Sequence, residues 1–531
     1  MNPIDVDPAQ IARARELAGK VTDEVQAFID KHTTVSVERS VLRLFGVDGA
    51  HKAPGVEIPL VNVVIDAVNK AGKLGLGVST IIAAAMKHEG PDAEPQDVCE
   101  KIAQGKITIE DLPAVTPAEV EKLLAVRADS AIQRLELCRR KKADKLSTYG
   151  DPPKPYKYLI VATGNIFEDV IQARAAVDAG ADIIAVIRST AQSLLDYVPI
   201  GTTTTGFGGT WATRENFRVM RNALDEEEKA RDKYIRLTNY SSGLCMSEIA
   251  VLAALEDLDC LLNDSMYGIL FRDINMKRTF IDQYFSRLVC ATSGIMIQTG
   301  EDNYLTTAES LGAFHQVVAS QFINESFAKK ATLPDELIGL GHAYEMDPTR
   351  KNSFLLELGQ ALLVKQCFPR NPLKYMSPTR HMTGDIFFGH VYDSFFSLVT
   401  VWAEQTTQLL GIPTEAIHTP FLQDRYLALG AAKYVHEAAA DIAGEIAFRK
   451  DGIIQNRART VLAEAVQLLE EVERIGLMEA IAKARFADVK RAVNGGKGLD
   501  GVVPRDERYV NPLLRRMVER GSANKGKRAV V

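Results

Sequence analysis

The sequence lacks the features of several functional classes. Lys and Arg together number 63 against 69 Asp and Glu, a formal net charge of −6, which gives no electrostatic reason to expect nucleic acid or an anionic membrane as a partner. The first residues, MNPIDVDPAQ, have neither the basic nor the apolar region of a signal peptide. No apolar run reaches the roughly 18 residues that a membrane-spanning helix needs. We therefore expect a cytoplasmic protein that binds neither nucleic acid nor a membrane.

Cysteine and histidine occur without the spacings that bind metals. The six cysteines form no CxxC or CxH pattern, so we expect reduced, mostly buried thiols. The nine histidines include no HExxH motif. The segment Asp30-Lys31-His32 begins like the cobalamin-ligating motif DxHxxG, but Val35 stands where that motif requires glycine. No metal ligand is predicted, and no lysine stands in a context that marks it as a Schiff-base residue.

The chain of 531 residues divides by its patterns into three zones. Residues 1–150 contain helical spacing at 13–32 and 118–146, interrupted by KAPGVEIPL at 52–60, and predict a helical accessory region. The Pro-rich segment 151–157 is typical of a linker. Residues 448–531 begin with a helical pattern at 458–476 and end in a basic tail, which predicts a C-terminal helical extension.

The middle zone, 151–447, alternates short apolar runs with amphipathic helical stretches. Eight runs are candidate strands: 158–164, 182–188, 234–242, 259–265, 295–302, 337–344, 373–379 and 416–421. Continuous apolar runs indicate strands buried on both faces of a parallel sheet. Eight strand–helix units of this total length predict an α/β fold, a (β/α)8 TIM barrel. A doubly wound sheet is the alternative, although the GxGxxG that would favour it is replaced by GNIFED after the first strand.

Polar side chains end most of these runs, where a barrel gathers its active-site residues. They are Arg188, Ser241, Ser242, Asn263, Asp264, Asp302, Asn303, His342 and His418. Polar residues follow strands in many proteins, but their density here favours a site at this face of the barrel.

One strand end has the chemistry of a phosphate site. The segment Arg188, Ser189, Thr190, Ala191, Gln192, Ser193 offers a guanidinium, hydroxyls and the amino-terminal end of a predicted helix. Simple helix capping by the hydroxyls is the alternative. The following TTTTGFGGT (202–210) has no lysine after its glycines and is not a nucleotide P-loop.

Four further residues could act at the same face. Tyr267 could stack on a flat cofactor ring with Arg272 nearby, and a packed core tyrosine is the alternative. Asp302 could bind an amine and Lys374 a carboxylate, while for each a structural ion pair is equally compatible with the sequence.

Several long stretches together resemble one family. They are IRSTAQSLLDYVPIGTTTTGFGGTW (187–211), LTNYSSGLCMSEIAVLAALE (237–256), NDSMYGILFRDINMKRTFIDQ (263–283), QTGEDNYLTTAE (298–309) and NPLKYMSPTRHMTGDIFFGH (371–390). With RSVLRLFGVDG (39–49), they make nearly the whole chain similar to the alpha subunits of lysine 5,6-aminomutases. That resemblance implies a barrel with a helical accessory region, dependence on pyridoxal phosphate (PLP) and adenosylcobalamin, and a radical mechanism. The reaction moves the terminal amino group of D-lysine or L-β-lysine to the adjacent carbon.

The resemblance also implies a partner and residue roles. A smaller beta subunit would carry the cobalamin domain and the PLP-binding lysine, in an alpha2–beta2 assembly. Arg188, Ser189, Thr190, Ala191, Gln192 and Ser193 would hold the PLP phosphate, and Ser242 would face the pyridine nitrogen. Tyr267 and Arg272 would stack on and flank the reacting ring, and Asp302 and Lys374 would bind the two ends of the substrate.

Three other functions remain open on the sequence. The first is the D-ornithine 4,5-aminomutase reaction, whose large component resembles this chain but is longer. A stand-alone phosphate-binding barrel lyase such as an aldolase would need its own lysine or metal. A non-catalytic scaffold subunit would leave the polar strand ends without a role.

Overall fold

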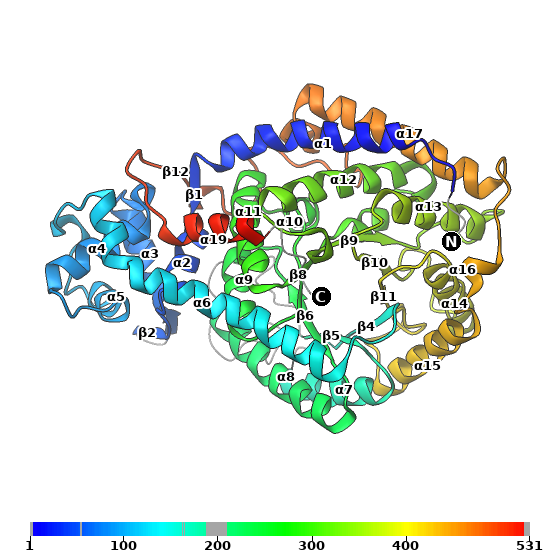
Figure 1. The fold of residues 1–531 in the computed structure, drawn as a ribbon, viewed down its shortest axis with the longest axis horizontal. Coiled ribbons are helices and arrows are strands. Elements are labelled where there is room, and N and C mark those ends of the chain that lie inside the picture. Colours follow the sequence, from blue (N-terminus) through cyan, green and yellow to red (C-terminus); the bar gives the residue numbers. More distant parts are fainter. Residues whose placement is uncertain (1–3, 54–55, 162, 164, 187–209, 525–531) are drawn as a thin grey trace.

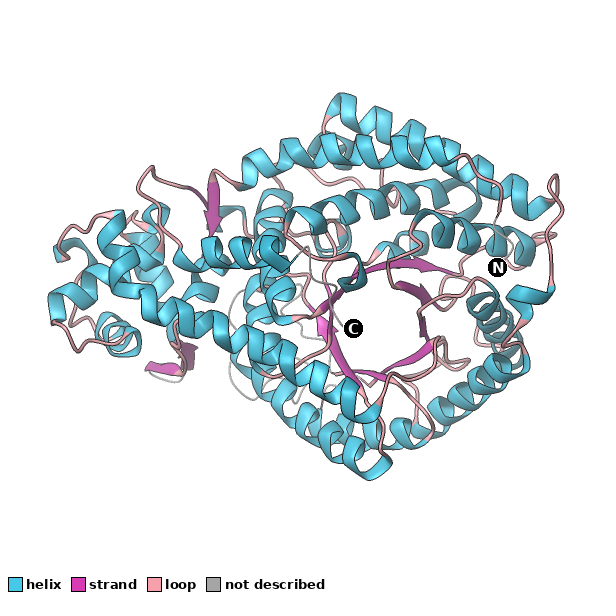
Figure 2. Ribbon diagram, in the orientation of Figure 1, coloured by secondary structure: helices cyan, strands magenta, loops and turns pink. Residues whose placement is uncertain are grey.

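The computed structural model describes residues 4–53, 56–161, 163, 165–186 and 210–524 (Figure 1). At its centre is a closed parallel barrel with the strand order β10-β11-β4-β5-β6-β7-β8-β9. The strands are β4 (Tyr156–Ile160), β5 (Ile183–Ala185), β6 (Arg236–Tyr240), β7 (Cys260–Leu262), β8 (Met296–Gln298), β9 (Ile338–Ala343), β10 (Leu373–Met376) and β11 (Thr407–Leu409). The TIM-barrel prediction is therefore confirmed, and Figure 2 shows the strands as a ring inside the helices.

Helices follow the strands and form the outer wall of the barrel. They are α7 (Ile166–Asp178), α8 (Thr210–Arg231), α9 (Met246–Leu255), α10 (Tyr267–Arg272), α11 (Met276–Ser293), α12 (Ser310–Lys330), α13 (Ser353–Cys367), α14 (Ile386–Trp402) and α15 (Leu422–Ala438). Short 3-10 turns η5 (Glu301–Thr306) and η6 (Asp335–Leu337) lie after β8 and before β9. Apolar side chains such as Tyr158, Ile183, Met376 and Leu409 fill part of the interior.

Seven of the eight predicted strands are confirmed, and the eighth is wrong. Residues 416–421 form turns, and the last strand is β11, about ten residues earlier. The sequence of β11, Thr-Gln-Leu, contains no apolar run, so the pattern used for the others fails. The side chain of Gln408 has hydrogen-bond partners on the outer helices. Its amide nitrogen donates to Ser397 Oγ on α14 (2.8 Å), and its oxygen lies 2.6 Å from His436 Nε2 on α15.

Elements from both ends of the chain lie outside the barrel. From the N-terminal zone these are α1 (Pro8–Ile29), β1 (His32–Thr34), α2 (Val35–Leu44), β2 (Ala50–Ala53), β3 (Val56–Pro59), α3 (Leu60–Lys70), η1 (Leu74–Leu76), α4 (Val78–Glu89), α5 (Pro95–Ala103), η2 (Ile109–Asp111) and α6 (Pro117–Tyr149). Helices α3, α4 and α5 form a group to one side of the barrel (Figure 1). From the C-terminal zone they are α16 (Ile442–Glu445), α17 (Ile453–Ile475), α18 (Leu477–Ala482), η7 (Leu499–Gly501), β12 (Val502–Pro504) and α19 (Pro512–Asn524). The predicted helices at 13–32, 118–146 and 458–476 correspond to α1, α6 and α17.

Several contacts join these ends. Strand β1 pairs antiparallel with β12, and α1 packs on α17. Helices α1 and α17 lie over α12, and α17 also contacts α13 (Figure 1). Helix α6 crosses α9 and α11 and starts with the capping box of Thr116 and Glu119. The side of the wall formed by α12 and α13 is thus covered by the chain itself.

The cysteines and the helices agree with two expectations from composition. All six cysteines are buried and none forms a disulfide, as predicted. Among the described residues, no helix combines the length and the apolar character that crossing a membrane requires.

Candidate active site

The strands bring most of those predicted site residues that the structure describes to one mouth of the barrel. Ser242 follows β6, Asp264 follows β7, Asp302 lies in η5 after β8, and Lys374 lies in β10. The predicted phosphate site, 188–193, falls outside the described residues. His418 lies in a turn rather than at a strand end, because the strand predicted there does not form. His342 belongs to β9 but stacks on Tyr375 at 4.3 Å, outside the barrel.

Tyr267 and Arg272 stand at the two ends of the short helix α10 and contact each other. Arg272 Nη2 donates to the Tyr267 hydroxyl at 3.0 Å, and the guanidinium carbon lies 5.5 Å from the ring centroid. A Cβ at Gly300 would lie 3.1 Å from carbons of Tyr267, so the absence of a side chain there gives the ring its space. The tyrosine is thus fixed from both sides, at 5 % exposure.

Ser242 lies beside this helix with an unused hydroxyl. A Cβ at Gly268 would meet the carbonyl oxygen of Ser242 at 2.3 Å, so α10 lies directly against the segment after β6. Ser242 is 1 % exposed, and its Oγ makes no hydrogen bond within the described part of the chain. The Nε of Arg272 is also buried without a described partner. A buried hydroxyl without a partner is costly, so these atoms fit a ligand with a polar ring atom.

Asp302 and Lys374 form a buried ion pair. Lys374 Nζ lies 2.7 Å from Asp302 Oδ2, with side-chain exposures of 4 % and 1 %. Burial raises the pKa of Asp302, and the Lys374 charge opposes that shift. The sequence left a structural ion pair open for each residue beside a role in substrate binding, and the structure pairs the two with each other.

Asp264 connects three segments of the site. Its Oδ1 accepts from the backbone N–H groups of Met266 (2.7 Å) and Tyr267 (2.5 Å). Its Oδ2 accepts from the Gly300 N–H at 3.0 Å and from Asn324 Nδ2 at 2.9 Å. One fully buried carboxylate therefore holds the start of α10, the turn that leads to Asp302, and helix α12.

A second layer supports Asp264, and sequence reasoning missed it. The fully buried Arg287 donates to Asn263 O (2.9 Å) and to Asn324 Oδ1 (2.7 Å) and O (3.1 Å). Asn324 Nδ2 also donates to Glu301 Oε1 at 2.6 Å. A signal was present, because Gln316, Ser320 and Asn324 recur every four residues along α12 and mark a polar stripe on one face of the helix.

The loop after β10, next to Lys374, is held by Glu345. Its carboxylate accepts from the N–H groups of Thr379 (2.8 Å) and Arg380 (3.1 Å). Burial raises the pKa of Glu345 to about 7.

Within the described residues, no group of three or more His, Cys, Asp or Glu side chains is arranged to hold a metal ion.

Comparison with known proteins gives consistent results. The family model "D-Lysine 5,6-aminomutase TIM-barrel domain of alpha subunit" matches residues 4–516. The lysine 5,6-aminomutase alpha subunit of Acetoanaerobium sticklandii is 50% identical over 97% of this chain and 99% of its own. That of Fusobacterium nucleatum is 49% identical over 97% and 98%. The D-ornithine 4,5-aminomutase subunit beta of Acetoanaerobium sticklandii is 28% identical over 68% of this chain and 51% of its own.

The buried ion pair predicts a pH-dependent loss of stability. In Lys374→Met the carboxylate of Asp302 is left without its cation, and we expect the free energy of unfolding at pH 8 to fall by about 3–5 kcal/mol. Because burial already raises the pKa of Asp302, the carboxyl takes up a proton as the pH falls, and the loss becomes smaller at pH 5. Urea denaturation at both pH values measures this difference.

The control is the double variant Lys374→Met, Asp302→Asn. It has no buried charge at this position, so the additional loss of Lys374→Met at pH 8 relative to pH 5 should be absent from it. A loss below about 1 kcal/mol in Lys374→Met at pH 8, the range of exposed pairs, would contradict a buried ion pair.

Proposed function

The chain belongs to the D-lysine 5,6-aminomutase alpha-subunit family, and we propose that its barrel moves the terminal amino group of D-lysine or L-β-lysine to the adjacent carbon. Aminomutases are isomerases, so the chain is a subunit of an enzyme of that kind. One observation carries the proposal. Ser242, Tyr267, Arg272, Asp302 and Lys374 lie at the same mouth of the barrel, and the Ser242 hydroxyl has no partner among the described residues.

The residues at this mouth suit PLP. The Tyr267 ring offers a stacking surface. Arg272 lies beside it, and its buried Nε has no hydrogen-bond partner in the described part of the chain. The Ser242 hydroxyl can face the pyridine nitrogen without forcing that nitrogen to be protonated, whereas a carboxylate would force it. The phosphate is assigned to Arg188 through Ser193, by the resemblance of that segment alone. When bound, adenosylcobalamin supplies a radical and PLP delocalises it, while the protein positions the reactants.

Asp302 and Lys374 suit the two charged ends of an amino acid. Asp302 can accept an ammonium group and Lys374 can bind a carboxylate, each exchanging its present partner for a substrate group. Both side chains lie in a dry environment, where charge–charge interactions are stronger than in water. The pair therefore keeps both charges ready and compensated before the substrate binds.

The proposal includes a partner. We infer a beta subunit that provides the cobalamin domain and the PLP-binding lysine, in an alpha2–beta2 assembly in the cytoplasm. Exposed apolar side chains at the starts of α7, α14 and α15 support docking beside the carboxyl mouth. Phe167, Phe387 and Phe421 are 64%, 80% and 65% exposed. Helices α14 and α15, and α15 and α7, are neighbours in the wall, and concentrated apolar exposure marks interaction surfaces.

We propose lysine rather than ornithine as the substrate because this chain is more similar to the relatives named for lysine. The relatives named for lysine are about 50% identical and match over their full length, whereas the ornithine relative is 28% identical over about half of its own. A stand-alone lyase would have to work without a partner, which the assay below detects.

The function is tested by supplying D-lysine, PLP and adenosylcobalamin to this chain alone and to the chain co-expressed with its partner. NMR should detect 2,5-diaminohexanoate only with the partner present. Product formed by the chain alone would place the PLP lysine on this subunit and contradict the proposal. Conversion of D-ornithine but not of D-lysine or L-β-lysine would favour the ornithine reaction.

The docking surface is tested separately. We expect Phe387→Ser with Phe421→Ser to weaken association of the two subunits by at least tenfold, because two large apolar contacts are lost. Analytical ultracentrifugation or calorimetry measures the affinity. Val126→Ser on α6 is the matched control, since Val126 is 77% exposed and lies on another part of the molecule. Equal affinities for all three proteins would remove this surface from the interface.

A further inference from the structure

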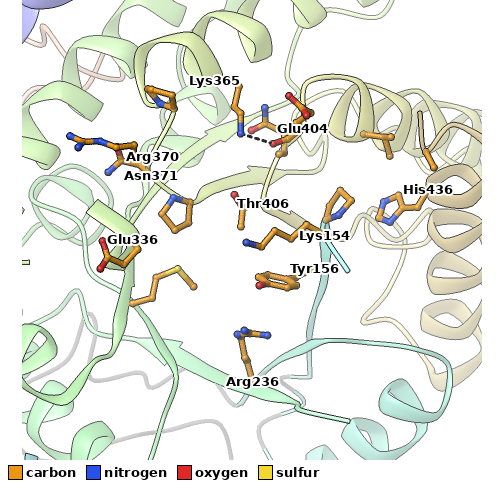
Figure 3. Close-up of a pocket in the computed structure, with 17 residues that line it drawn as sticks. Lys154, Tyr156, Arg236, Glu336, Lys365, Arg370, Asn371, Glu404, Thr406 and His436 are labelled. Carbon is orange, nitrogen blue, oxygen red and sulfur yellow. Dashed lines mark hydrogen bonds between the residues drawn. The ribbon is translucent and has the colours of Figure 1, made fainter. Parts of the chain in front are cut away.

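A second cleft lies at the opposite, amino-terminal mouth of the barrel (Figure 3). Its volume is about 530 Å³, and its walls come from the segments that enter the strands. Lys154 and Tyr156 lie at the start of β4, Arg236 begins β6, Thr406 precedes β11, and His436 comes from α15. None of these residues belongs to the candidate active site, which is formed by the strands' other ends.

Arg236 is a buried cation that lines this cleft. It is 5% exposed, and its guanidinium carbon lies 4.4 Å from the Tyr156 ring centroid and 4.9 Å from that of Tyr234. Its Nη2 donates to Asp151 Oδ1 at 2.6 Å. Its Nη1 is buried and has no hydrogen-bond partner in the part of the chain that the structure describes. A buried guanidinium nitrogen is rarely left in that state, so Nη1 is a candidate donor to a bound oxyanion.

The surroundings of Arg236 supply further groups for an anion. Lys154 Nζ is 4.0 Å from Asp151 Oδ2 and 5.6 Å from the Tyr156 ring centroid. Thr406 Oγ1 accepts from the Leu373 N–H at 3.1 Å, and its side chain points into the cleft (Figure 3). Burial lowers the pKa of His436 to about 4, so this ring is neutral at physiological pH.

The cleft also contains acids, and their positions limit the ligand. Asp151 Oδ1 accepts from Arg236 Nη2. The Tyr156 hydroxyl lies 2.7 Å from Asp151 Oδ1 and 2.6 Å from Oδ2. Glu336 and Glu404 lie on other walls, together with Lys365 and Arg370 (Figure 3). With the adjoining Asp151 counted, the cleft has four cationic and three acidic side chains, which leaves a small excess of positive charge.

We propose that this cleft binds a small metabolite through an oxyanion, a phosphate or a carboxylate, held by Arg236, Lys154 and Thr406. Arginine donates two parallel hydrogen bonds to such groups, and a lysine adds a second charge. The volume is typical of small-molecule sites and leaves room for a body beyond the oxyanion. This site lies at the end of the barrel away from the chemistry, so its ligand does not compete with the amino-acid substrate.

The test is calorimetric titration of the complete enzyme, with its partner subunit and saturating PLP, which keeps the active-site phosphate position filled. Inorganic phosphate and succinate are titrated separately, to distinguish a phosphate from a carboxylate ligand. We expect saturable binding of at least one probe, with one site per copy of this chain. Arg236→Gln and Lys154→Met should each raise its dissociation constant at least tenfold.

Lys154→Met keeps the test valid if Arg236→Gln fails to fold, because the Lys154 side chain is 56% exposed and lies at the rim. Lys141→Met is the matched control, since Lys141 is 48% exposed and pairs with Asp257 elsewhere on the surface. It should leave the affinity unchanged. Absence of saturable binding by both probes would overturn the proposal, and so would binding that the Lys154 variant does not alter.

Discussion

The carboxylate of Asp264 is the constraint on which the candidate active site depends. It accepts four hydrogen bonds, from the start of α10, from the turn after β8 and from α12. Tyr267 and Arg272 belong to the first of these segments and Asp302 to the second. A buried carboxylate is stable only when its oxygens are satisfied, so the segments cannot separate without a large cost. The segments that carry the residues of this mouth are therefore held together by one side chain.

The barrel strands, the terminal helices and the outer helices have different roles around Asp264. The strands bring polar residues from distant parts of the chain to one mouth, and the terminal helices cover the wall at α12, whose Asn324 supports Asp264. The wall formed by α14 and α15 carries exposed apolar side chains, where we propose that the partner docks. Among the described residues the two mouths differ in chemistry. One presents a compensated ion pair and a hydroxyl without a hydrogen-bond partner, and the other presents an arginine with one nitrogen unpaired.

The sequence predicts the barrel well because most of its strands are apolar runs. The prediction fails at β11, which is not an apolar run. Strand β11 is Thr-Gln-Leu, and its Gln408 is paired with Ser397 and His436, which no local pattern reveals. The site residues could be named through their resemblance to a family, but their contacts could not. The Asp302–Lys374 pair joins β8 and β10 regions that are distant in sequence. The role of Asp264 depends on Gly300 and Asn324, which only the folded chain brings near it.

The most direct test of the account is the PLP affinity of Asp264→Asn, measured on the complete enzyme beside Asp259→Asn. Asp259 lies at the other end of β7, is 6% exposed, and accepts from Leu237 N (2.8 Å) and Arg221 Nη1 (3.3 Å). Both variants should lose stability, by about 1–3 kcal/mol for buried groups left unsatisfied. Only Asp264→Asn should also weaken PLP, by tenfold or more, because Tyr267 and Arg272 lose their anchor. Equal PLP affinity in the two variants would contradict the central role of Asp264.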